Sequence, residues 1–533
     1  MGELSVLFCT EGTYPYVHGG VSTWCEILCK DLPSVDFTLF AITGTPEVTF
    51  KYDPPPNARR IVHIPLWGAQ EPAEYILADV PFSEVYERKL RTTDDQIEIY
   101  FLPLLRTFLR AMDKPDGDVA CDGPVIWKLW RYFQRYDWNT TWKSKPAWET
   151  FKSESVRVFE ENPSNYLANE LPSVFDLTTC MRWMYNFLMP LQAPVPECDV
   201  VHATIAAFTG IAGIVAKHEY GSAFLVTDHG VFARERYIAV SAGPFSFFCK
   251  RFLINMSCFI SRLNYMYADV VSPVANFNRR WEIPYGADER KIETIYNGID
   301  PARFESRPKP ERTAHRPTAV AVARVFPLKD LFTMIRSAAV ARDSIPDVWF
   351  IVYGSLDADP PYVAKCRALI EELKLEENFE FAGFHSKPNE AFCEGDISVL
   401  SSISEGFPFT VLESMACERP VVGTDVGGVK EALEGFGVVV PPRDPEAFGR
   451  GVVALLSDDD LRIELGRRAR QEILAKFRTS TSVDAYLELY RRLAASKRAG
   501  TIPRGPTPGM GLGLYESFSS QPVPASVDGG DRP

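Results

Sequence analysis

Residues 396–428 read DISVLSSISEGFPFTVLESMACERPVVGTDVGG, and two carboxylates, Glu405 and Glu413, stand eight positions apart with no other charge between them. The residues before Glu405 alternate as a strand does, Pro408 suits a first helical turn, and the last eight residues resemble a strand entering a glycine-rich loop. The pattern predicts a strand–loop–helix–strand unit, with Glu405 in the loop and Glu413 about two turns into the helix. Ligands of open α/β sheets bind at such carboxyl ends of strands.

Length and charge limit the classes of protein to consider. A chain of 533 residues is long enough for two or three domains. Its net charge of −13, without a strongly basic stretch, argues against a nucleic-acid binder and against unaided docking to an anionic membrane. The 11 cysteines include no C-x2-C pair, which favours small core residues over zinc ligands or disulfides.

The sequence also predicts a cytoplasmic protein without a membrane span. The opening residues MGELSVLF lack the basic region of a signal peptide. The uncharged stretch 203–216 is too short to cross a bilayer.

The first 306 residues show a βα rhythm with one interruption. Short apolar runs predict strands at 4–9, 37–42, 198–203, 224–227, 268–274 and 292–296. A helix through Lys30 follows Gly19 and Gly20, which permit a close backbone approach to a ligand. Residues 54–180 depart from this rhythm, and we expect a mostly helical insertion there. Its many aromatic residues include Trp127, Trp130, Trp138, Trp142 and Trp148. These tryptophans pack in a core or stack on sugars, of which packing is the more common role.

A second βα series follows a Pro- and charge-rich linker at 307–317. Strands are expected at 318–323, 348–353, 379–381, 397–400, 421–422 and 438–440. We therefore predict an α/β protein with two doubly wound domains, 1–306 and 318–478. A helix at 479–499 would return to the first domain, and the Pro-, Gly- and Ser-rich residues 500–533 would form a disordered tail.

Two cations strengthen the case for a ligand site in the second domain. Arg324 and Lys329 stand five apart before a predicted helix, where a guanidinium and an ammonium can hold a diphosphate, although exposed cations near a helix start are equally common. Tyr353-Gly354 ends another strand, where backbone can approach a ligand closely. With carboxylates that accept hydroxyl pairs, these residues indicate a nucleotide-diphosphate-sugar site.

This set of motifs resembles the GT4 family of retaining glycosyltransferases, which has the GT-B fold of two Rossmann-like domains facing a central cleft. The motifs are Glu405 to Glu413, Arg324 with Lys329, NGID at 297–300, Gly19-Gly20 and DHG at 228–230. The second domain is similar to the family along its length, and the first only at its strand ends. The long insertion and TDHGVFARER at 227–236 look like the PelF-type subgroup of Pel exopolysaccharide glycosyltransferases.

The resemblance implies roles for particular residues. Arg324 and Lys329 would hold the donor diphosphate, Glu405 the sugar hydroxyls and Glu413 the nucleotide ribose. His229 would lie near the transferring sugar, and Gly19 and Gly20 would approach the donor phosphate or the acceptor. The remaining donor-site residues would be Tyr353, Gly354, Gly406, Phe407, Pro408, Phe409 and Thr410. His229, Glu405, Arg324 and Lys329 form the expected catalytic set.

The family also implies a UDP-sugar donor such as UDP-glucose, a carbohydrate acceptor, no required metal or cofactor, and inner-membrane polysaccharide synthase subunits as partners. Transfer with retention would proceed by front-face attack, with a donor phosphate oxygen taking the acceptor proton. A metal-dependent GT-A enzyme is one rival, since Asp357-Ala358-Asp359 supplies a D-x-D. A soluble sucrose- or glycogen-type synthase and a non-catalytic nucleotide-sugar-binding subunit of a membrane synthase are the others.

Overall fold

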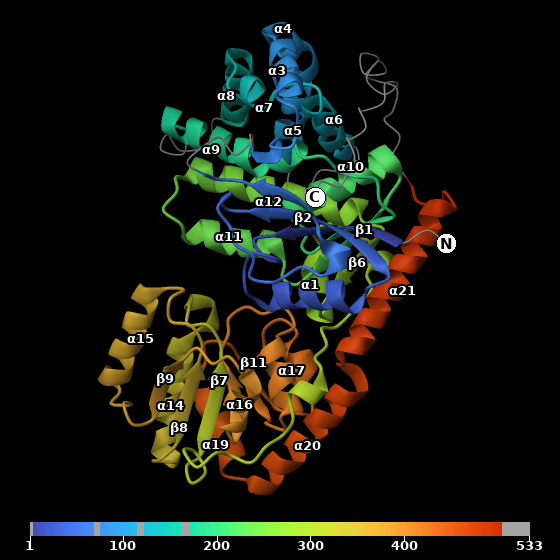
Figure 1. Cartoon of the computed structure of the whole chain (residues 1–533). Coiled ribbons are helices and arrows are strands. Elements are labelled where there is room, and N and C mark those ends of the chain that lie inside the picture. Colours follow the sequence, from blue (N-terminus) through green and yellow to red (C-terminus); the bar gives the residue numbers. More distant parts are fainter. Residues whose placement is uncertain (1–3, 69–74, 115–121, 162–170, 504–533) are drawn as a thin grey trace. The chain divides into compact units, whose positions relative to one another are not determined.

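The computed structural model describes residues 4–68, 75–114, 122–161 and 171–503. The chain forms two compact units, each built on a six-stranded sheet (Figure 1). The first contains the described residues up to Ser272, Trp281–Glu293 and those from Leu487 on, and the second contains Pro273–Arg280 and Thr294–Tyr486. No helix within the described ranges is long and apolar enough to cross a membrane.

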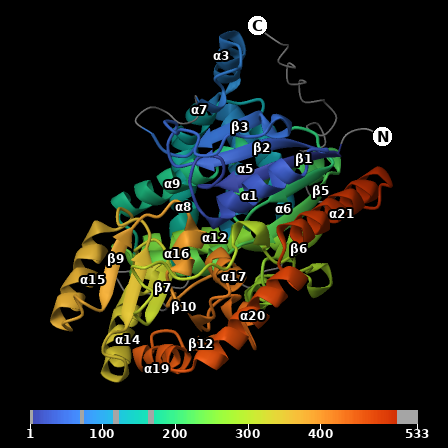
Figure 2. The same ribbon diagram turned by 60° about the horizontal axis from the view of Figure 1, so that its bottom comes forward.

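The first sheet has the strand order β3-β2-β1-β4-β5-β6, and β1, β2 and β3 lie side by side in Figure 2. The strands are β1 (Leu4–Glu11), β2 (Val35–Thr43), β3 (Arg60–Pro65), β4 (Val200–Ala203), β5 (Ala223–Asp228) and β6 (Val270–Pro273). β1 pairs in parallel with both β2 and β4. Its residues Val6 to Cys9 are almost fully buried, as expected of a parallel strand covered on both faces.

Helices of two groups complete the first unit. Those between the strands are α1 (Gly20–Asp31), α10 (Ile211–Tyr220), α11 (Phe232–Ala242) and α12 (Phe247–Tyr267). Those of the insertion are α3 (Phe82–Arg91), α4 (Asp94–Gln96), α5 (Leu102–Met112), α6 (Gly123–Phe133), α7 (Trp138–Trp142), α8 (Lys145–Glu161) and α9 (Val174–Phe187). Trp130, Trp138 and Trp142 are buried in the core of this unit, so these three rings have a packing role.

The second sheet has the order β12-β11-β10-β7-β8-β9, and each pair of neighbouring strands is parallel. Its strands are β7 (Thr318–Val322), β8 (Trp349–Tyr353), β9 (Phe379–Gly383), β10 (Ile397–Leu400), β11 (Val421–Thr424) and β12 (Val438–Val440). Its helices are α14 (Leu331–Ser344), α15 (Pro360–Glu372), α16 (Pro388–Cys393), α17 (Phe409–Ala416), α18 (Val429–Leu433), α19 (Pro445–Leu456) and α20 (Asp459–Lys476). The last helix, α21 (Thr479–Arg498), begins in this unit and ends in the first. Two parallel sheets with intervening helices confirm the predicted pair of doubly wound α/β domains.

Two elements differ from the prediction. The insertion expected at 54–180 is mostly helical, but near its start, after a 3-10 turn at Pro56–Ala58, it contains β3, an edge strand whose charged first residue and terminal proline conceal its apolar centre. Residues 292–296 do not form a strand. Ile292 makes only an isolated bridge to Val271, because the chain leaves the first unit after Glu293.

The predicted linker and the predicted C-terminal tail can also be compared with the structure. Residues 307–317, predicted as a linker, lie in the second unit, where Lys309 Nζ is 2.6 Å from Asp396 Oδ2. The predicted tail lies outside the described residues from position 504 on.

A buried histidine joins the last helix to the first sheet. His202, on β4, is within hydrogen-bonding distance of the Thr227 hydroxyl (2.7 Å) and the Tyr490 hydroxyl of α21 (2.6 Å). Burial lowers the pKa of His202 well below its usual range, so the ring is neutral and donates through one nitrogen while it accepts through the other. Residues 487–498 of α21 are thereby fixed to β4 within the first unit.

We expect Tyr490→Phe to lower the free energy of unfolding by about 2 kcal/mol, because it leaves a buried ring nitrogen without its partner. Urea unfolding monitored by circular dichroism measures the change. Tyr86→Phe, at a half-exposed position on α3, is the matched control and should be neutral. Equal stability of both variants would show that the Tyr490–His202 contact contributes nothing.

Candidate functional site

Lys329 and Glu405 meet at the carboxyl edge of the second sheet. Lys329 follows β7 and Glu405 follows β10, and these strands are parallel neighbours. The ammonium of Lys329 lies 2.6 Å from Glu405 Oε1, and the Ser402 hydroxyl donates to the same oxygen at 2.5 Å. The Ser401 hydroxyl also donates to the carbonyl of Lys329 at 2.8 Å. Strand pairing and these bonds therefore hold a cation and a carboxylate together.

Arg324 remains exposed on the same loop. Its guanidinium carbon lies 5.2 Å from the centre of the Phe326 ring, and it makes no ion pair or hydrogen bond with a described residue. Backbone bonds from Ala323 to Tyr353 and from Val325 to Ser355 hold the loop beside the end of β8. The guanidinium is consequently available to a ligand.

Gly354 and Tyr353 have structural explanations. A Cβ at Gly354 would lie 1.9 Å from the carbonyl oxygen of Ala323, so no larger residue fits. The Tyr353 hydroxyl donates to Glu394 at 2.7 Å, and burial raises the pKa of this phenol. The ring thus faces the protein, and only the backbone of Tyr353 is left for a ligand.

The loop after Glu405 is fixed by the glycines that follow β11. The N–H of Gly428 donates to the carbonyl of Gly406 at 2.6 Å. A Cβ at Gly427, which has a φ of 55°, would lie 2.0 Å from the carbonyl oxygen of Glu405. Side chains at these two glycines would therefore separate the two loops.

Phe407 anchors the same loop in the core. Its ring is buried, and the Tyr296 and Phe477 ring centres lie 5.0 and 5.3 Å away. The Asn297 amide donates to its carbonyl at 2.9 Å. Because its ring is enclosed, Phe407 shapes the loop rather than presenting its side chain to a ligand.

Glu413 lies on α17, the helix that follows the Glu405 loop, and is close to the start of that helix. Pro408 occupies the N-cap position of α17, and Phe409 and Thr410 are the first two residues of the helix. The N–H groups of Phe409 and Thr410 have no acceptor within the helix. Glu413 is the fifth residue, little more than one turn in, so the predicted two turns are too many. Burial raises the pKa of its partly buried carboxyl to about 7, and the charge of Arg303 lowers it slightly. No hydrogen bond from a described residue reaches this carboxyl.

In the first unit, His229 and the start of α1 lie close together. His229 follows β5, and its ring centre is 4.5 Å from that of Trp24 on α1. Burial lowers its pKa to about 3, and Nε2 is buried without a partner among the described residues. At Gly19, next to Gly20 at the start of α1, an added Cβ would meet no atom within 4 Å, so packing alone does not require glycine.

Asp228, before His229, is a structural residue. The Tyr265 hydroxyl and the N–H of Ala206 donate to its carboxylate at 2.5 and 3.0 Å, and burial raises its pKa to about 6. These bonds fix the loop that carries His229.

The motifs did not identify Ser402, Trp24 or Glu11. Ser402 and Trp24 orient Glu405 and His229, and nothing in their sequence context distinguishes them from ordinary residues. Glu11 ends β1 before Gly12, which is a usable signal, and one of its carboxylate oxygens is buried without a partner in the described chain.

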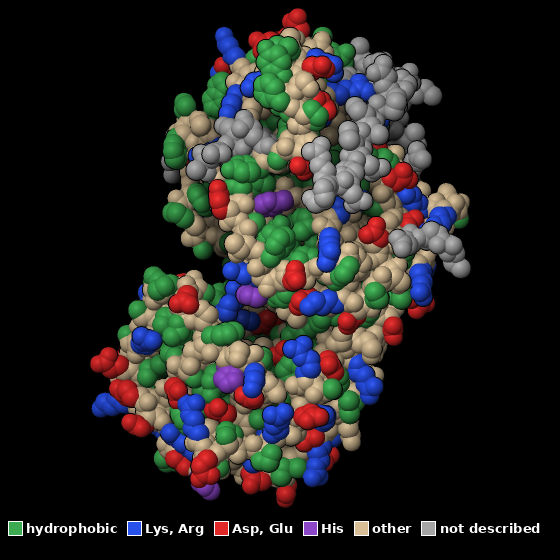
Figure 3. All heavy atoms as spheres, viewed as in Figure 1, with side chains coloured by type: hydrophobic (Ala, Val, Ile, Leu, Met, Phe, Trp, Pro, Cys, Tyr) green, Lys and Arg blue, Asp and Glu red, His purple; other side chains and the backbone are tan. Residues whose placement is uncertain are grey.

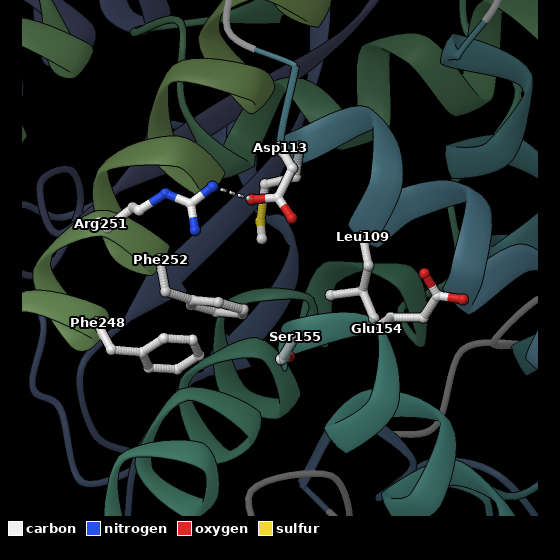
Figure 4. Close-up of a pocket in the computed structure, with 8 residues that line it drawn as sticks. Leu109, Asp113, Glu154, Ser155, Phe248, Arg251 and Phe252 are labelled. Atoms are coloured by element: carbon white, nitrogen blue, oxygen red, sulfur yellow. Dashed lines mark hydrogen bonds and ion pairs between the residues drawn. The ribbon is translucent and has the colours of Figure 1, made fainter. Parts of the chain in front are cut away.

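Two other features lie apart from the predicted residues. Within the described ranges no group of His, Cys, Asp and Glu side chains could hold a metal ion. Asp357 and Asp359 of the D-x-D bond to Ser355 and cap α15, respectively. A small pocket of the first unit (Figure 4) is lined by Leu109, Met112, Asp113, Glu154, Ser155, Phe248, Arg251 and Phe252, none of which belongs to the predicted set.

Comparisons with known proteins match two parts of the chain to different family models. Residues 4–290 match the family model described as Domain of unknown function (DUF3492). Residues 302–472 match the model described as Glycosyl transferases group 1, which includes the loops of Arg324, Lys329, Glu405 and Glu413.

Curated relatives are similar over part of their length. D-inositol 3-phosphate glycosyltransferase of Kineococcus radiotolerans is 28% identical over 250 residues, which cover 41% of this chain and 56% of the relative. Trehalose synthase of Thermococcus litoralis is 31% identical over 182 residues, or 33% of this chain and 44% of the relative. The chain thus spans about half the length of the curated relatives it matches.

Solved structures show the fold. Sucrose-phosphate synthase from Thermosynechococcus elongatus aligns with a TM-score of 0.55 at 16% identity, over 92% of this chain and 100% of the other. Anabaena HepE in complex with UDP and glucose aligns with a TM-score of 0.54 at 14% identity, over 92% and 100%. These likenesses confirm the predicted GT-B type of architecture with two doubly wound sheets. Because the first family model covers more than half of its 533 residues, the chain belongs to the DUF3492 family, and it carries a group 1 glycosyltransferase domain in its second half.

Proposed function

We propose that the protein is a retaining glycosyltransferase that transfers a sugar from a UDP-sugar, UDP-glucose or a related donor, to a carbohydrate acceptor. The observation that carries the proposal is the Lys329–Glu405 pair, at the sheet edge where such folds bind ligands and inside the group 1 segment. Anabaena HepE, which shares the fold, is solved with UDP and glucose, and this supports the choice of donor.

Charge balance explains why two cations are needed. The diphosphate of a UDP-sugar carries about two negative charges. Lys329 is already paired with Glu405, so this pair adds little net positive charge. The unpaired guanidinium of Arg324 supplies the missing charge and can bind two phosphate oxygens at once. As the sugar leaves UDP, both cations stabilise the growing negative charge of the leaving group.

The two carboxylates bind different parts of the donor: Glu405 binds the sugar and Glu413 binds the ribose. Lys329 and Ser402 both occupy Oε1 of Glu405, and no described residue bonds to Oε2, which is therefore open to a sugar hydroxyl. Glu413 has an unpaired carboxyl suited to the ribose diol. The backbone of Gly406 and the N–H groups that start α17, at Phe409 and Thr410, orient the donor between these two contacts.

For the first unit, we propose that His229 binds a substrate hydroxyl through its buried, unpartnered Nε2. At neutral pH the ring is uncharged, because its pKa is about 3. At Gly19 no atom lies within 4 Å of where a Cβ would be, which leaves room for a substrate beside Gly20 at the start of α1. The proposed reaction retains configuration by front-face attack, in which a donor phosphate oxygen accepts the proton of the acceptor hydroxyl, and it requires no metal.

We propose further that the acceptor is a growing exopolysaccharide, as in Pel biosynthesis, and that the enzyme acts in the cytoplasm with inner-membrane synthase subunits. This part rests on the resemblance of 227–236 and of the aromatic insertion to PelF-type enzymes.

A donor panel tests the function. Purified protein is incubated with UDP-, GDP- and ADP-sugars, with and without EDTA, and binding, hydrolysis and transfer are followed. We expect turnover of a UDP-sugar that EDTA does not reduce, and a loss of about 100- to 1000-fold in kcat/KM for Arg324→Ala, because a preorganised phosphate contact is removed.

Arg336→Ala, at an exposed position on α14, is the matched control and should behave as wild type. Binding of UDP-sugars without turnover would identify a non-catalytic subunit instead. Loss of activity in EDTA would exclude the metal-independent route.

The two carboxylates should separate in kinetic tests. Glu405→Ala should lower kcat about 100-fold while UDP binds at least as well, because Lys329 loses its competing partner. Glu413→Ala should instead weaken UDP binding about tenfold by removing the ribose contact. Isothermal titration and initial rates measure both, with exposed Glu434→Ala as control. Equal effects of the two substitutions on UDP binding and on kcat would exclude separate roles for Glu405 at the sugar and Glu413 at the ribose.

Affinity for UDP-glucose should rise with pH through about 7 in the wild type but not in Glu413→Gln, because only the ionised carboxylate accepts both ribose hydroxyls. The raised pKa also destabilises the folded protein as pH rises from about 4.5 to 7, since the folded state binds more protons there. Glu413→Gln should therefore match wild-type stability near pH 4.5 and exceed it at pH 8 by at most about 3 kcal/mol. Thermal melts at both pH values measure this, and a constant difference would contradict the assignment.

A further inference from the structure

One segment of the first unit departs from the acidic character of the chain. Residues 236–268 contain no Asp or Glu, although these make up 70 of the 533 residues, about one in eight. The same segment carries four cations: Arg236, Lys250, Arg251 and Arg262. It also includes the uncharged run YIAVSAGPFSFFC at 237–249.

Much of this uncharged run faces solvent. It forms the second half of α11, a turn through Gly243 and Pro244, and the start of α12. Tyr237 is 57% exposed, and Ile238, Phe245 and Phe247 are exposed by 41–45%. The Lys250 ammonium donates to the carbonyl of Ser241 at 2.9 Å and so stabilises the turn. The turn presents aromatic rings outward.

The start of α9 extends the same surface. Val174 and Phe175 are 72% and 78% exposed. The Ser246 hydroxyl donates to Asp176 at 2.7 Å, and the rings of Trp183 and Phe245 pack edge to face at 5.0 Å. Figure 3 shows hydrophobic side chains at the margin where Figure 1 draws α9 and the α11–α12 turn. We call this surface the aromatic corner: Val174, Phe175, Tyr237, Ile238, Phe245 and Phe247.

The aromatic corner is large for a monomer's free surface. Its exposed area is on the order of 600 Å², at the upper end of what soluble monomers show, and patches of that size mark interaction sites. Exposed Arg182 on α9 adds another cation beside it. The acids on these elements are Asp176 on α9, which keeps its charge, and Glu235 on α11. They are outnumbered by the cations Arg182, Arg234, Arg236 and Lys250. The local charge is therefore positive.

We infer that the aromatic corner docks the protein on a lipid bilayer that carries anionic head groups. Aromatic side chains flanked by cations are suited to the boundary between head groups and acyl chains. A second copy of the chain is a poorer occupant, because a twofold interface would bring Arg182 and Lys250 toward their own copies. Docking does not require the proposed enzymatic activity.

Vesicle flotation of the full-length chain tests the inference. The probes are vesicles of phosphatidylcholine alone and of phosphatidylcholine with phosphatidylglycerol, at low and high salt. We expect binding to the anionic vesicles that weakens in salt. The double variant Phe245→Ser, Phe247→Ser should bind about tenfold more weakly, since two exposed rings are lost from the contact.

Matched variants keep the result interpretable. Phe82→Ser with Tyr86→Ser removes two exposed rings from α3, outside the aromatic corner, and should bind as wild type. Phe175→Ser repeats the test on a second element, and thermal melts confirm that each variant folds.

Three results would overturn the inference. The first is wild-type protein that does not bind anionic vesicles, and the second is a Phe245→Ser, Phe247→Ser variant that binds them as well as wild type. The third is a dimer, seen by sedimentation velocity, that these substitutions dissociate, which would assign the surface to self-association.

Discussion

The candidate donor site depends on the parallel pairing of β10 with β7. Their register, Ile397 with Ala319 and Ser398 with Val320, brings both strand ends to one edge. Residues 76 positions apart, Lys329 and Glu405, consequently meet at 2.6 Å. Because side chains alternate between faces, a slip of one residue in this register would disturb every contact at the edge.

Close backbone contacts then hold the loops in place. Gly354 presses against Ala323, and Gly427 against Glu405, at distances that leave no space for a Cβ. A glycine here serves the protein's own packing, whereas Gly19 meets no such neighbour. The glycine-rich motifs that look alike in the sequence thus have different physical reasons, and Gly19 retains the stronger argument for a ligand.

The site also keeps groups that folding alone would not favour. Glu413 loses hydration without gaining a hydrogen bond, and the buried nitrogen of His229 has no partner in the described chain. Such unsatisfied groups destabilise a folded protein unless something binds them. Both groups lie near the carboxyl ends of strands, where ligands of such sheets bind, and this position favours a function in substrate binding.

Sequence patterns were sufficient for most strands and for the sheet edge at which Lys329 and Glu405 meet, because periodicity reports burial and turn residues report strand ends. The patterns failed where neighbouring residues mask the hydrophobic alternation of a strand, and where a total over the whole chain conceals a local difference. β3 begins with the charged Arg60 and ends with Pro65, so its pattern was obscured. The sequence pattern also does not predict where a side chain points. Phe407 and Tyr353 are next to the predicted donor site in the sequence, but their side chains point into the protein. Ser402 carries no signature at all.

The net charge of the whole chain does not describe the charge near one part of its surface. The total of −13 argued against docking to an anionic membrane, yet charges act mainly within a Debye length, about 8 Å in physiological salt. Acids elsewhere on the chain are largely screened at that range. The field at the aromatic corner is set instead by the charges near it, where Arg182, Arg234, Arg236 and Lys250 outnumber Asp176 and Glu235. Local composition along 236–268 is therefore a better guide to this surface than the charge of the whole protein.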